Sequence, residues 1–430
     1  MKMLRMLSAA AALVVAAGSV SQPTSAQTAI VTLDEAITLA MRYSPTITQA
    51  LGDIRIAQAT RRETVSDWLP TLRGSTGWSA NSTNRFDEQT QRSVSGSATS
   101  VNGSLTASYT LFDGFRRNAQ SRARGADLHG VEATYISQEF QVILQTKQAF
   151  FSALAGEELV RVSETRITRA ERQLQVSRDR LAAGSAIRSD TLRSFVEQAN
   201  AQLQLINAQT SLATASANLA RLIGHDGLVR AVSDSASGSI VEIDTTALRV
   251  EALESGPSVR QAIAAARAAD AQVGVSRAAY FPSVTASYSR SVAGSQLDAL
   301  NGSWTGRLNL SWNIFQGFGR ETGIAQSAVR LDVAESRIED TRRQVNAELT
   351  QQFAALQSAR LRLDIAGASF AAAAEDLRVQ QQRYRLGAGT IVDVMTSQVN
   401  LDQAEVDAVE ARLDYLLAKA QIEAIVGREI

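Results

Sequence analysis

The sequence contains no cysteine, so neither a disulfide nor a lipid attached through cysteine can stabilise or anchor the chain. It contains only two histidines, His129 and His225, and no motif for a catalytic nucleophile or a phosphate-binding loop. Metal centres and catalytic triads are built from these residue types. We therefore expect no enzymatic activity, no metal site and no cofactor, and we place both histidines at the surface.

An excess of charge of one sign is also lacking, because 43 basic residues balance 43 acidic ones. Nucleic-acid binding depends on clustered Lys and Arg, so this balance argues against a nucleic-acid partner. Proline occurs five times and aromatic residues make up 5% of the chain, whereas Ala, Ser, Gln, Arg and Leu are abundant. That bias is typical of long helices rather than of a dense globular core.

The first 26 residues have the layout of a secretory signal peptide. Lys2 and Arg5 precede an apolar run over residues 7–17, and small and polar residues follow up to Ala26. An uncleaved membrane anchor is the alternative, but the run is shorter than the roughly 20 residues that a spanning helix needs. We expect cleavage after Ala26, which leaves 41 basic and 43 acidic residues.

The rest of the chain contains two copies of one pattern. The four prolines after residue 26 form two pairs at a separation of 212 positions: Pro45 with Pro257, and Pro70 with Pro282. Residues 109–115 return as residues 312–318, only 203 positions later. The first copy therefore carries nine additional residues, within the polar stretch 80–100. We assign repeat 1 to residues 27–247 and repeat 2 to residues 248–430.

Each copy shows the same order of periodicities. Apolar residues recur at helical spacing over about 33–68 and again over 248–280. Apolar and polar residues then alternate, as they do in β-strands. These alternations predict a hairpin of two strands per copy, at about 70–82 and 101–112 in repeat 1 and at about 282–290 and 303–315 in repeat 2.

The predicted strands are apolar on one side and polar on the other, which suits a membrane barrel with a wet interior. A soluble antiparallel sheet with one buried face is the alternative. Aromatic residues gather where strands meet helices, as in an interfacial girdle: Trp68, Tyr109, Phe112, Tyr280, Trp312 and Phe315. Lipid does not tolerate open strand edges, and a membrane barrel needs at least about eight strands. Four strands are too few, so we expect several chains to share one barrel; three chains give twelve strands.

Two stretches without proline, 115–183 and 318–386, predict continuous helices of about 100 Å at 1.5 Å per residue. Within them, large apolar residues recur every seven positions, as in a coiled-coil seam. The series are Val160, Ile167, Leu174 and Leu181 in repeat 1, and Leu349, Leu356, Leu363, Phe370, Leu377 and Tyr384 in repeat 2. Short breaks follow each long helix. A second helix of about 35 residues then returns, to Leu222 in repeat 1 and to Val426 in repeat 2.

This layout resembles the TolC family of outer-membrane factors over essentially the whole mature chain. The resemblance rests on the duplicated order of elements, on Phe112-Asp-Gly-Phe115 with Phe315-Gln-Gly-Phe318, and on the segment from Tyr384 to Val394. It implies an α+β membrane protein, mainly α, in which a trimeric 12-stranded β-barrel with four strands per chain continues into a long periplasmic α-helical coiled-coil barrel.

The resemblance also implies a function: an outer-membrane exit duct of a tripartite export system in a Gram-negative cell. Its partners would be outer-membrane lipid, a periplasmic adaptor and an inner-membrane pump of the ABC or RND type. The absence of a lipid-attachment cysteine fits the branch associated with type I secretion and drug export. A periplasmic adaptor, which also uses a long helical hairpin, is the rival identity, and the membrane-type strands argue against it.

In the family, the tips of the helical hairpins meet the adaptor, and the matching residues here are Ala183, Gly184, Ser185, Leu386, Gly387 and Ala388. Glycine is, however, expected at any tight helix break. Family carboxylates ring the periplasmic mouth at the places of Asp190 and Asp393. Three chains would gather six carboxylates, which would favour cations and raise the affected pKa values.

A simpler role for Asp190 and Asp393 is that each caps the returning helix or lies in its first turn, where the helix dipole favours an acid. Both roles are compatible. The chain has Thr396 and Gly389 where some relatives have an aspartate and an arginine. The resemblance therefore does not extend to a gate held by those two groups.

Overall fold

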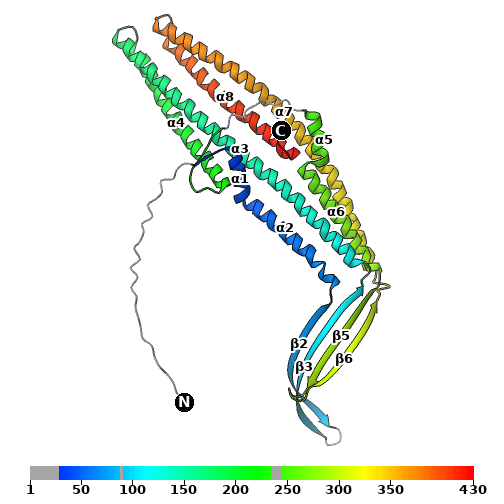
Figure 1. Cartoon of the computed structure of the whole chain (residues 1–430). Helices are drawn as coiled ribbons and strands as arrows, with labels where there is room; N and C mark the ends of the chain where they lie inside the picture. The colour runs from blue at the N-terminus through cyan, green and yellow to red at the C-terminus, as the bar shows by residue number, and fades with distance from the viewer. Residues whose placement is uncertain (1–28, 88–90, 234–243) are drawn as a thin grey trace, which may run out of the picture.

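The computed structural model describes residues 29–87, 91–233 and 244–430, and the expected signal peptide lies outside these residues. Two sets of eight elements follow one another in the same order of types (Figure 1). The first set is β1 (Ala29–Val31), α1 (Leu33–Tyr43), α2 (Pro45–Glu63), η1 (Ser66–Trp68), β2 (Thr71–Asp87), β3 (Arg92–Phe112), α3 (Arg116–Ala182) and α4 (Arg188–Ile223). The second is β4 (Val229–Ala231), α5 (Thr245–Ser255), α6 (Pro257–Arg277), η2 (Ala278–Tyr280), β5 (Ser283–Gly294), β6 (Asn301–Ser311), α7 (Gly319–Arg385) and α8 (Ile391–Val426).

The first helical stretch of each copy is divided, so the prediction of one helix over about 33–68 is wrong. Pro45 is the first residue of α2, and Ser44 before it is extended, with φ −63° and ψ 124°. Gly256, before Pro257, is extended in the same way, with φ −60° and ψ 151°. Proline excludes the helical conformation from the preceding residue but is well suited to a first helical position. Proline therefore ends one helix and begins the next.

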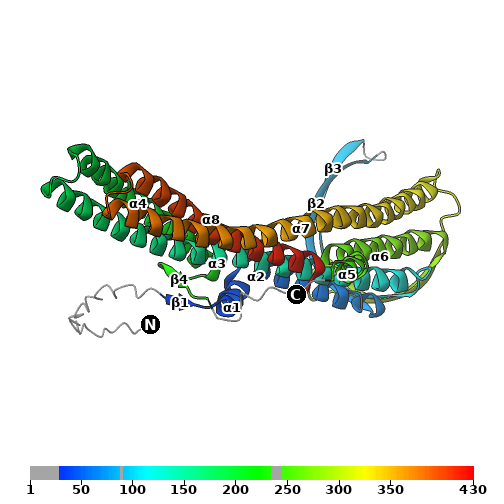
Figure 2. The same cartoon turned by 90° about the horizontal axis from the view of Figure 1, so that it is seen from above.

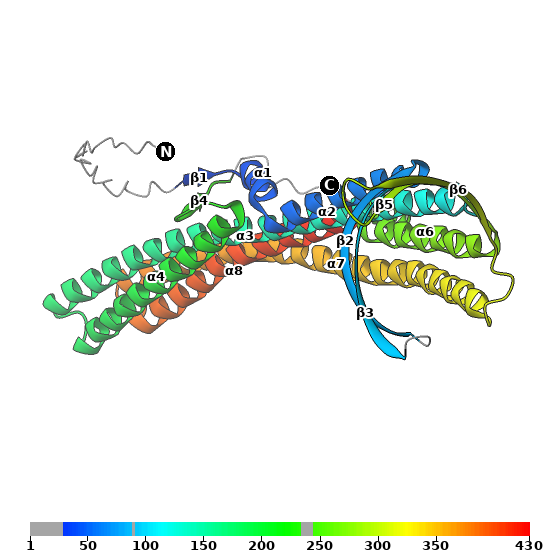
Figure 3. The same cartoon turned by 90° about the horizontal axis from the view of Figure 1, so that it is seen from below.

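The four long strands form an antiparallel sheet in the order β2-β3-β5-β6, and β1 pairs in parallel with β4. Among the described residues of the protomer, β2 and β6 each have one edge without a paired strand. The hairpin of β2 and β3 is longer than predicted, with strands of 17 and 21 residues against 12 and 11 in β5 and β6. The nine additional residues of repeat 1 thus lengthen this hairpin beyond the rest of the sheet (Figures 2 and 3).

Strand β6 ends at Ser311, four residues before the predicted end at Phe315. The reason is that β5, the strand paired with β6, begins at Ser283, directly opposite Ser311, so the residues after Ser311 have no partner in the described sheet. A tight turn before α7 follows, in which Gly317 and Phe318 both adopt left-handed conformations, with φ 59° and 65°. The aromatic residues Trp312 and Phe315 therefore lie in the strand–helix junction rather than in the strand.

The helices form one elongated layer that runs from the sheet to two tips, the α3–α4 turn and the α7–α8 turn (Figure 1). The helices α3 and α7 have 67 residues each, and α4 and α8 have 36 each. Near the sheet, α6 packs on both α3 and α7; toward the tips, α4 packs on α3 and α8 on α7. In the described part of the chain, no helix is both long and apolar enough to cross a membrane.

The core is divided along the layer. The middle cluster includes Phe150, Leu219 and Tyr415, from α3, α4 and α8, packed with α1. Near the tip, Leu377 and Tyr384 of α7 pack on α8. The predicted seam is thus buried at Leu174, Leu349, Leu377 and Tyr384, whereas Phe370 remains 40% exposed.

Candidate functional site

The two faces of the sheet differ in chemistry. Large apolar residues of the outer strands β2 and β6 are strongly exposed, among them Trp78 (70%) and Leu308 (71%). The alternating positions carry hydroxyl pairs across neighbouring strands: Ser75 with Ser104 at 2.8 Å, Ser79 with Ser100 at 2.8 Å, Ser291 with Ser303 at 2.9 Å, and Thr106 with Ser289 at 3.0 Å. An apolar face of this extent suits contact with lipid, and the hydroxyl-bearing face suits a water-filled interior.

The strand–helix junction brings together most of the predicted interfacial aromatics. The Arg117 guanidinium lies 4.4 Å from the ring centre of Trp68, and Arg320 lies 4.1 Å from that of Tyr280. The indole Nε1 of Trp312 donates to the Tyr280 carbonyl at 3.2 Å. These arginines were not predicted, although their separation of 203 positions matches the repeat and could have revealed them.

A second aromatic cluster surrounds the turn into each long helix. The ring of Phe115 lies 5.3 Å from Phe112 and 5.8 Å from Phe281, both edge to face. Phe315 and Phe318 form the corresponding pair at 5.6 Å. Sequence reasoning chose Phe112 and Phe315 but not their partners. The role of these aromatics as a lipid-interface girdle stays a prediction.

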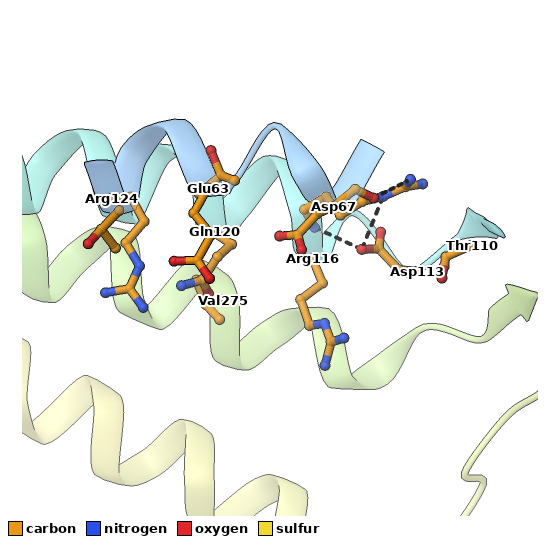
Figure 4. A pocket seen from close by; sticks show the side chains of 11 residues that line it. Glu63, Asp67, Thr110, Asp113, Arg116, Gln120, Arg124 and Val275 are labelled. Carbon is orange, nitrogen blue, oxygen red and sulfur yellow. Dashed lines mark hydrogen bonds and ion pairs between the residues drawn. The ribbon is translucent and has the colours of Figure 1, made fainter. Parts of the chain in front are cut away.

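A polar recess of about 440 Å³ lies beside the junction, between α2, α3 and α6 (Figure 4). Arg116 and Arg124 extend into it from α3, opposite Glu63 of α2. Arg117 is held at its rim, where Nη1 donates to the Asp67 carbonyl at 3.2 Å and Nε lies 3.3 Å from an Asp113 carboxylate oxygen. Among the described residues, no group of three His, Cys, Asp or Glu side chains could hold a metal ion.

The two tips have the same backbone geometry. At the first tip, Gly184 is left-handed with φ 72°, and Ser185 donates its backbone N–H to the Arg180 carbonyl at 2.9 Å. At the second, Gly387 has φ 79°, and Ala388 donates to the Arg383 carbonyl at 2.8 Å. This pattern of bonds is the Schellman ending, which requires a residue tolerant of positive φ.

The tip surface is open to a partner. A Cβ atom at Gly184 or Gly387 would meet no atom within 4 Å. The side chains next to the turns are strongly exposed, with Leu386 at 84%. Ala183, Ser185 and Ala388 are exposed as well. All six predicted tip residues therefore lie at the ends of the helical hairpins, and their contact with an adaptor stays a prediction.

The two predicted mouth aspartates differ from each other. Asp393 forms a capping box with Thr390: its carboxylate accepts from the Thr390 N–H at 3.0 Å, and the Thr390 hydroxyl accepts from the Asp393 N–H at 3.2 Å. The bond from the Thr390 backbone, the Thr390 hydroxyl and the charge of Arg383 lower the Asp393 pKa. This direction is opposite to the rise that six gathered carboxylates would cause, and in the protomer Asp393 acts as a cap.

Asp190 occupies the equivalent third position of α4, but Ile187 precedes the helix there and cannot provide a side-chain cap. Among the described residues, the Asp190 carboxylate takes part in no hydrogen bond or ion pair. The capping role, which sequence reasoning allowed for both aspartates, therefore applies only to Asp393.

A group of largely buried charged side chains connects helices of the two repeats, between the tips and the middle core cluster. Arg169 of α3 contacts Asp402 at 2.8 Å and Glu405 at 2.6 Å, both on α8. Arg166 lies 2.9 Å from Asp402 and 2.9 Å from Glu197 of α4, although its Nε is not aligned for a hydrogen bond to Asp402. Burial raises the pKa of Asp402, and the two arginines offset only part of that effect. Sequence reasoning missed this group.

The fold and these surfaces define an outer-membrane channel protein rather than an enzyme. The chain belongs to the outer membrane efflux protein family, whose model matches residues 36–225 and again residues 248–428. The chain is therefore an exit duct located in the outer membrane and extending into the periplasm.

Curated relatives and solved structures agree with this assignment. The chain is 25% identical to Protein CyaE of Bordetella pertussis over 90% of its own length and 81% of the relative's. It is 26% identical to the pyoverdine export outer membrane protein OpmQ of Pseudomonas aeruginosa, over 92% and 85%. Its fold is similar to that of CusC, with a TM-score of 0.81 at 18% identity over 95% and 96% of the two chains. It is also similar to the MtrE outer membrane channel of Neisseria gonorrhoeae in its open state, with a TM-score of 0.76 at 20% identity over 92% and 89%.

Proposed function

We propose that three copies of the chain form one duct, with a 12-stranded β-barrel in the outer membrane and a coiled-coil barrel of helices in the periplasm. The observation that carries this proposal is the four-stranded sheet, which has an apolar face and two edges that lack a paired strand in the part of the chain that the structure describes. Lipid does not tolerate such edges, so further chains must close the sheet. Three chains supply twelve strands, the number that the resemblance to the TolC family implies.

The helices support the same assembly. Four large apolar residues of α4 follow coiled-coil spacing and are all more than half exposed: Leu192, Val196, Leu203 and Ile206. An exposed stripe of this kind marks a protein contact. In the proposed trimer, a helix of the next chain covers it.

The partners follow from the two ends of the duct. The six tip residues, Ala183 to Ser185 and Leu386 to Ala388, contact a periplasmic adaptor, which links the duct to an inner-membrane pump of the ABC or RND type. The aromatics of the strand–helix junction contact outer-membrane lipid.

The cargo belongs to type I secretion, to multidrug efflux or to both. The two repeats, 27–247 and 248–430, each supply one strand hairpin and one helical hairpin.

Asp190 and Asp393 of three chains form the periplasmic mouth and favour cations there. Both lie in the first turn after a tip. Single-channel conductance in a planar bilayer tests the assembly and the mouth together. The wild type is compared with Asp190→Asn and Asp393→Asn combined, and with the control pair Asp332→Asn and Asp340→Asn, two exposed carboxylates of α7 far from the tip.

The proposal expects discrete pores from a trimeric species, with a cation preference that weakens in the first double variant and not in the control. Pores whose selectivity is unchanged would remove the two aspartates from the mouth and leave the duct. A folded protein that is monomeric in detergent would contradict the shared barrel.

A further inference from the structure

The polar recess beside the strand–helix junction is lined by two helices that carry opposite charges (Figure 4). On α3, Arg116 and Arg124 are eight residues apart, about 12 Å along the helix axis, and extend in the same direction. On α2, Glu63 and Asp67 are one helical turn apart and line the other side. Two positive and two negative side chains therefore surround one cavity of about 440 Å³.

These four side chains have few partners within the chain. Arg116, Glu63 and Asp67 are exposed. In the described part of the chain, the Arg116 guanidinium and the carboxylates of Glu63 and Asp67 take part in no hydrogen bond or ion pair. Arg124 has one contact, with Asp127 at 3.4 Å, in which both side chains are more than 40% exposed. The four charges are therefore available to a ligand.

Arg117, at the rim of the recess, is bound into the fold instead. Its Nη1 and Nη2 donate to the carbonyl oxygens of Asp67 and Leu111 at 3.2 and 3.3 Å, and its Nε lies 3.3 Å from the Asp113 carboxylate. Its guanidinium also lies over the ring of Trp68. Arg117 therefore holds the junction together, and Asp113 neutralises its charge.

Repeat 2 keeps this contact of the junction but lacks the four free charges. Arg320, the equivalent of Arg117, lies 4.1 Å from the ring centre of Tyr280, the equivalent of Trp68. The four charged side chains are replaced by uncharged residues: Gly319 for Arg116, Ser327 for Arg124, Val275 for Glu63 and Ala279 for Asp67. The junction of repeat 2 folds without them, so folding does not account for the four charges of repeat 1.

The recess opens on the hydroxyl-bearing side of the sheet. Thr110 of β3 lines it. Because side chains alternate along a strand, Thr110 shares a face with Thr106, whose hydroxyl lies 3.0 Å from that of Ser289. In the proposed duct this face lines the water-filled interior. The ligand of the recess is therefore a water-soluble molecule rather than a membrane lipid, and this placement rests on the proposed function.

We propose that the recess binds small zwitterions, which are molecules that carry both an ammonium group and a carboxylate. Arg116 and Arg124 bind the carboxylate, which a guanidinium group matches in shape and charge. Glu63 and Asp67 bind the ammonium group. An ion of a single sign is disfavoured, because half of the four side chains repel it. The cavity volume lies within the range of about 300 to 1,000 Å³ that is common for small-molecule sites.

The exposure of these side chains suits a channel. Exposed ion pairs contribute little binding energy, so the recess holds a zwitterion weakly and releases it again. Passage through a channel requires binding of this kind, strong enough for entry and weak enough for exit. Each protomer thus supplies one transient binding site for zwitterionic solutes, at the level where the barrel meets the helices.

A series of amino acids with increasing charge separation tests the proposal: glycine, 4-aminobutyrate and 6-aminohexanoate. Hexanoate and hexylammonium are the matched probes, since each keeps the carbon chain and only one of the two charges. Saturation-transfer NMR on the purified protein in detergent measures the binding of each probe. The recess variants are Arg116→Gln and Glu63→Gln. The control variants are Arg122→Gln and Asp53→Asn, which change exposed charges of the same two helices outside the recess.

We expect at least one zwitterion of the series to bind the wild type and both control variants. Its affinity for each recess variant should be lower by about tenfold or more, because each variant removes one charge-assisted contact. Thermal unfolding midpoints of the recess variants should match that of the wild type. A fall in these midpoints would assign the charges to the fold and overturn the site.

Three further results would overturn the site: no binding of any zwitterion to the wild type, equal binding of hexanoate or hexylammonium, or undiminished binding to the recess variants. Native mass in the same detergent reports on the assembly separately. A trimer that binds no zwitterion would overturn the site alone. A monomer that binds zwitterions with the expected dependence on Arg116 and Glu63 would support the site and overturn the proposed duct.

Discussion

The guanidinium of Arg180 lies 4.2 Å from the ring centre of Tyr384, and it also donates hydrogen bonds to the carbonyl oxygens of Tyr384 and, at 3.1 Å, of Ser185. Arg180 belongs to α3 and Tyr384 to α7, so this contact joins the two tips of one protomer. The Tyr384 hydroxyl is buried without a hydrogen-bond partner among the described residues, and the ring therefore acts through its face.

Replacing Arg180 by alanine should loosen both tips. A cation–π contact contributes about 0.5 to 2 kcal/mol, and each hydrogen bond about 1 kcal/mol. Amide hydrogen exchange over residues 180–190 and 384–394 should accelerate at least several-fold. Arg178→Ala, two positions away on an exposed site, is the control and should change little. Tyr384→Phe keeps the ring, so its amide hydrogen exchange should match that of wild type. An acceleration of exchange as large as that caused by Arg180→Ala would contradict the assigned geometry.

Asp393→Asn should weaken the first turn of α8 in a pH-dependent way. Because bonds from Thr390 lower the folded pKa of Asp393 below its unfolded value, the stabilisation is present above the unfolded pKa and is lost as pH falls through the folded pKa. At pH 7, hydrogen exchange at residues 391–394 should be faster in the variant than in wild type. The difference should disappear well below pH 3.9, the ordinary aspartate pKa.

Asp190→Asn is the matched comparison for that experiment, since Asp190 holds the same helical position without a capping bond. Exchange in the first turn of α4 should be nearly unchanged by it. Equal effects at both aspartates would mean that the helix dipole, rather than the Thr390 bonds, accounts for the stabilisation.

Arg169→Met should destabilise the helical layer strongly. It leaves the carboxylates of Asp402 and Glu405 largely buried with fewer positive partners, and breaking a buried ion pair on one side costs about 3 to 5 kcal/mol. Arg378→Met removes an exposed pair with Glu375 and should cost at most about 1 kcal/mol. Thermal unfolding in the same detergent measures the difference in stability between the two variants, as a difference in their unfolding midpoints. Similar midpoints for both would show that the Arg169 group is well hydrated.

Two glycines with nearly the same φ angle should lose different amounts of stability when each is replaced by alanine. Gly114 has φ 71° and Gly184 has φ 72°. Both substitutions should destabilise the protein by about 1 to 2 kcal/mol, because alanine is unfavourable in a left-handed conformation. At Gly114, the new Cβ would also lie 2.6 Å from the Phe281 Cβ and 2.8 Å from the Ala278 carbonyl oxygen, which should add about 1 to 3 kcal/mol.

Gly184→Ala therefore serves as the control for backbone strain alone. Thermal unfolding and the yield of folded protomer measure the difference between the two variants. Equal losses of stability in the two variants would show that the aromatic cluster around Phe281 moves aside with little loss of free energy.

Local patterns were sufficient for the main elements. The absence of proline over 115–183 and 318–386 predicted α3 and α7 to within about a residue, and alternation predicted that each copy has two strands. Local patterns were less reliable where two tendencies compete. Pro45 and Pro257 divide stretches whose apolar spacing is continuous. Strand β6 ends at Ser311, before Trp312 and Phe315, because its partner strand β5 begins opposite Ser311.

The sequence by itself determined the duplication, the helix and strand types, the chemistry of the strand faces and the positions of both tips, because each depends on residues close together in the chain. The difference between Asp393 and Asp190 is local as well, because Thr390 stands three positions before Asp393, whereas Ile187, which has no side-chain acceptor, stands three positions before Asp190. Only the tertiary structure decided that Arg180 meets Tyr384 and that Arg169 meets Asp402. These two contacts join residues more than 200 positions apart, so they exist only after the long helices pack side by side.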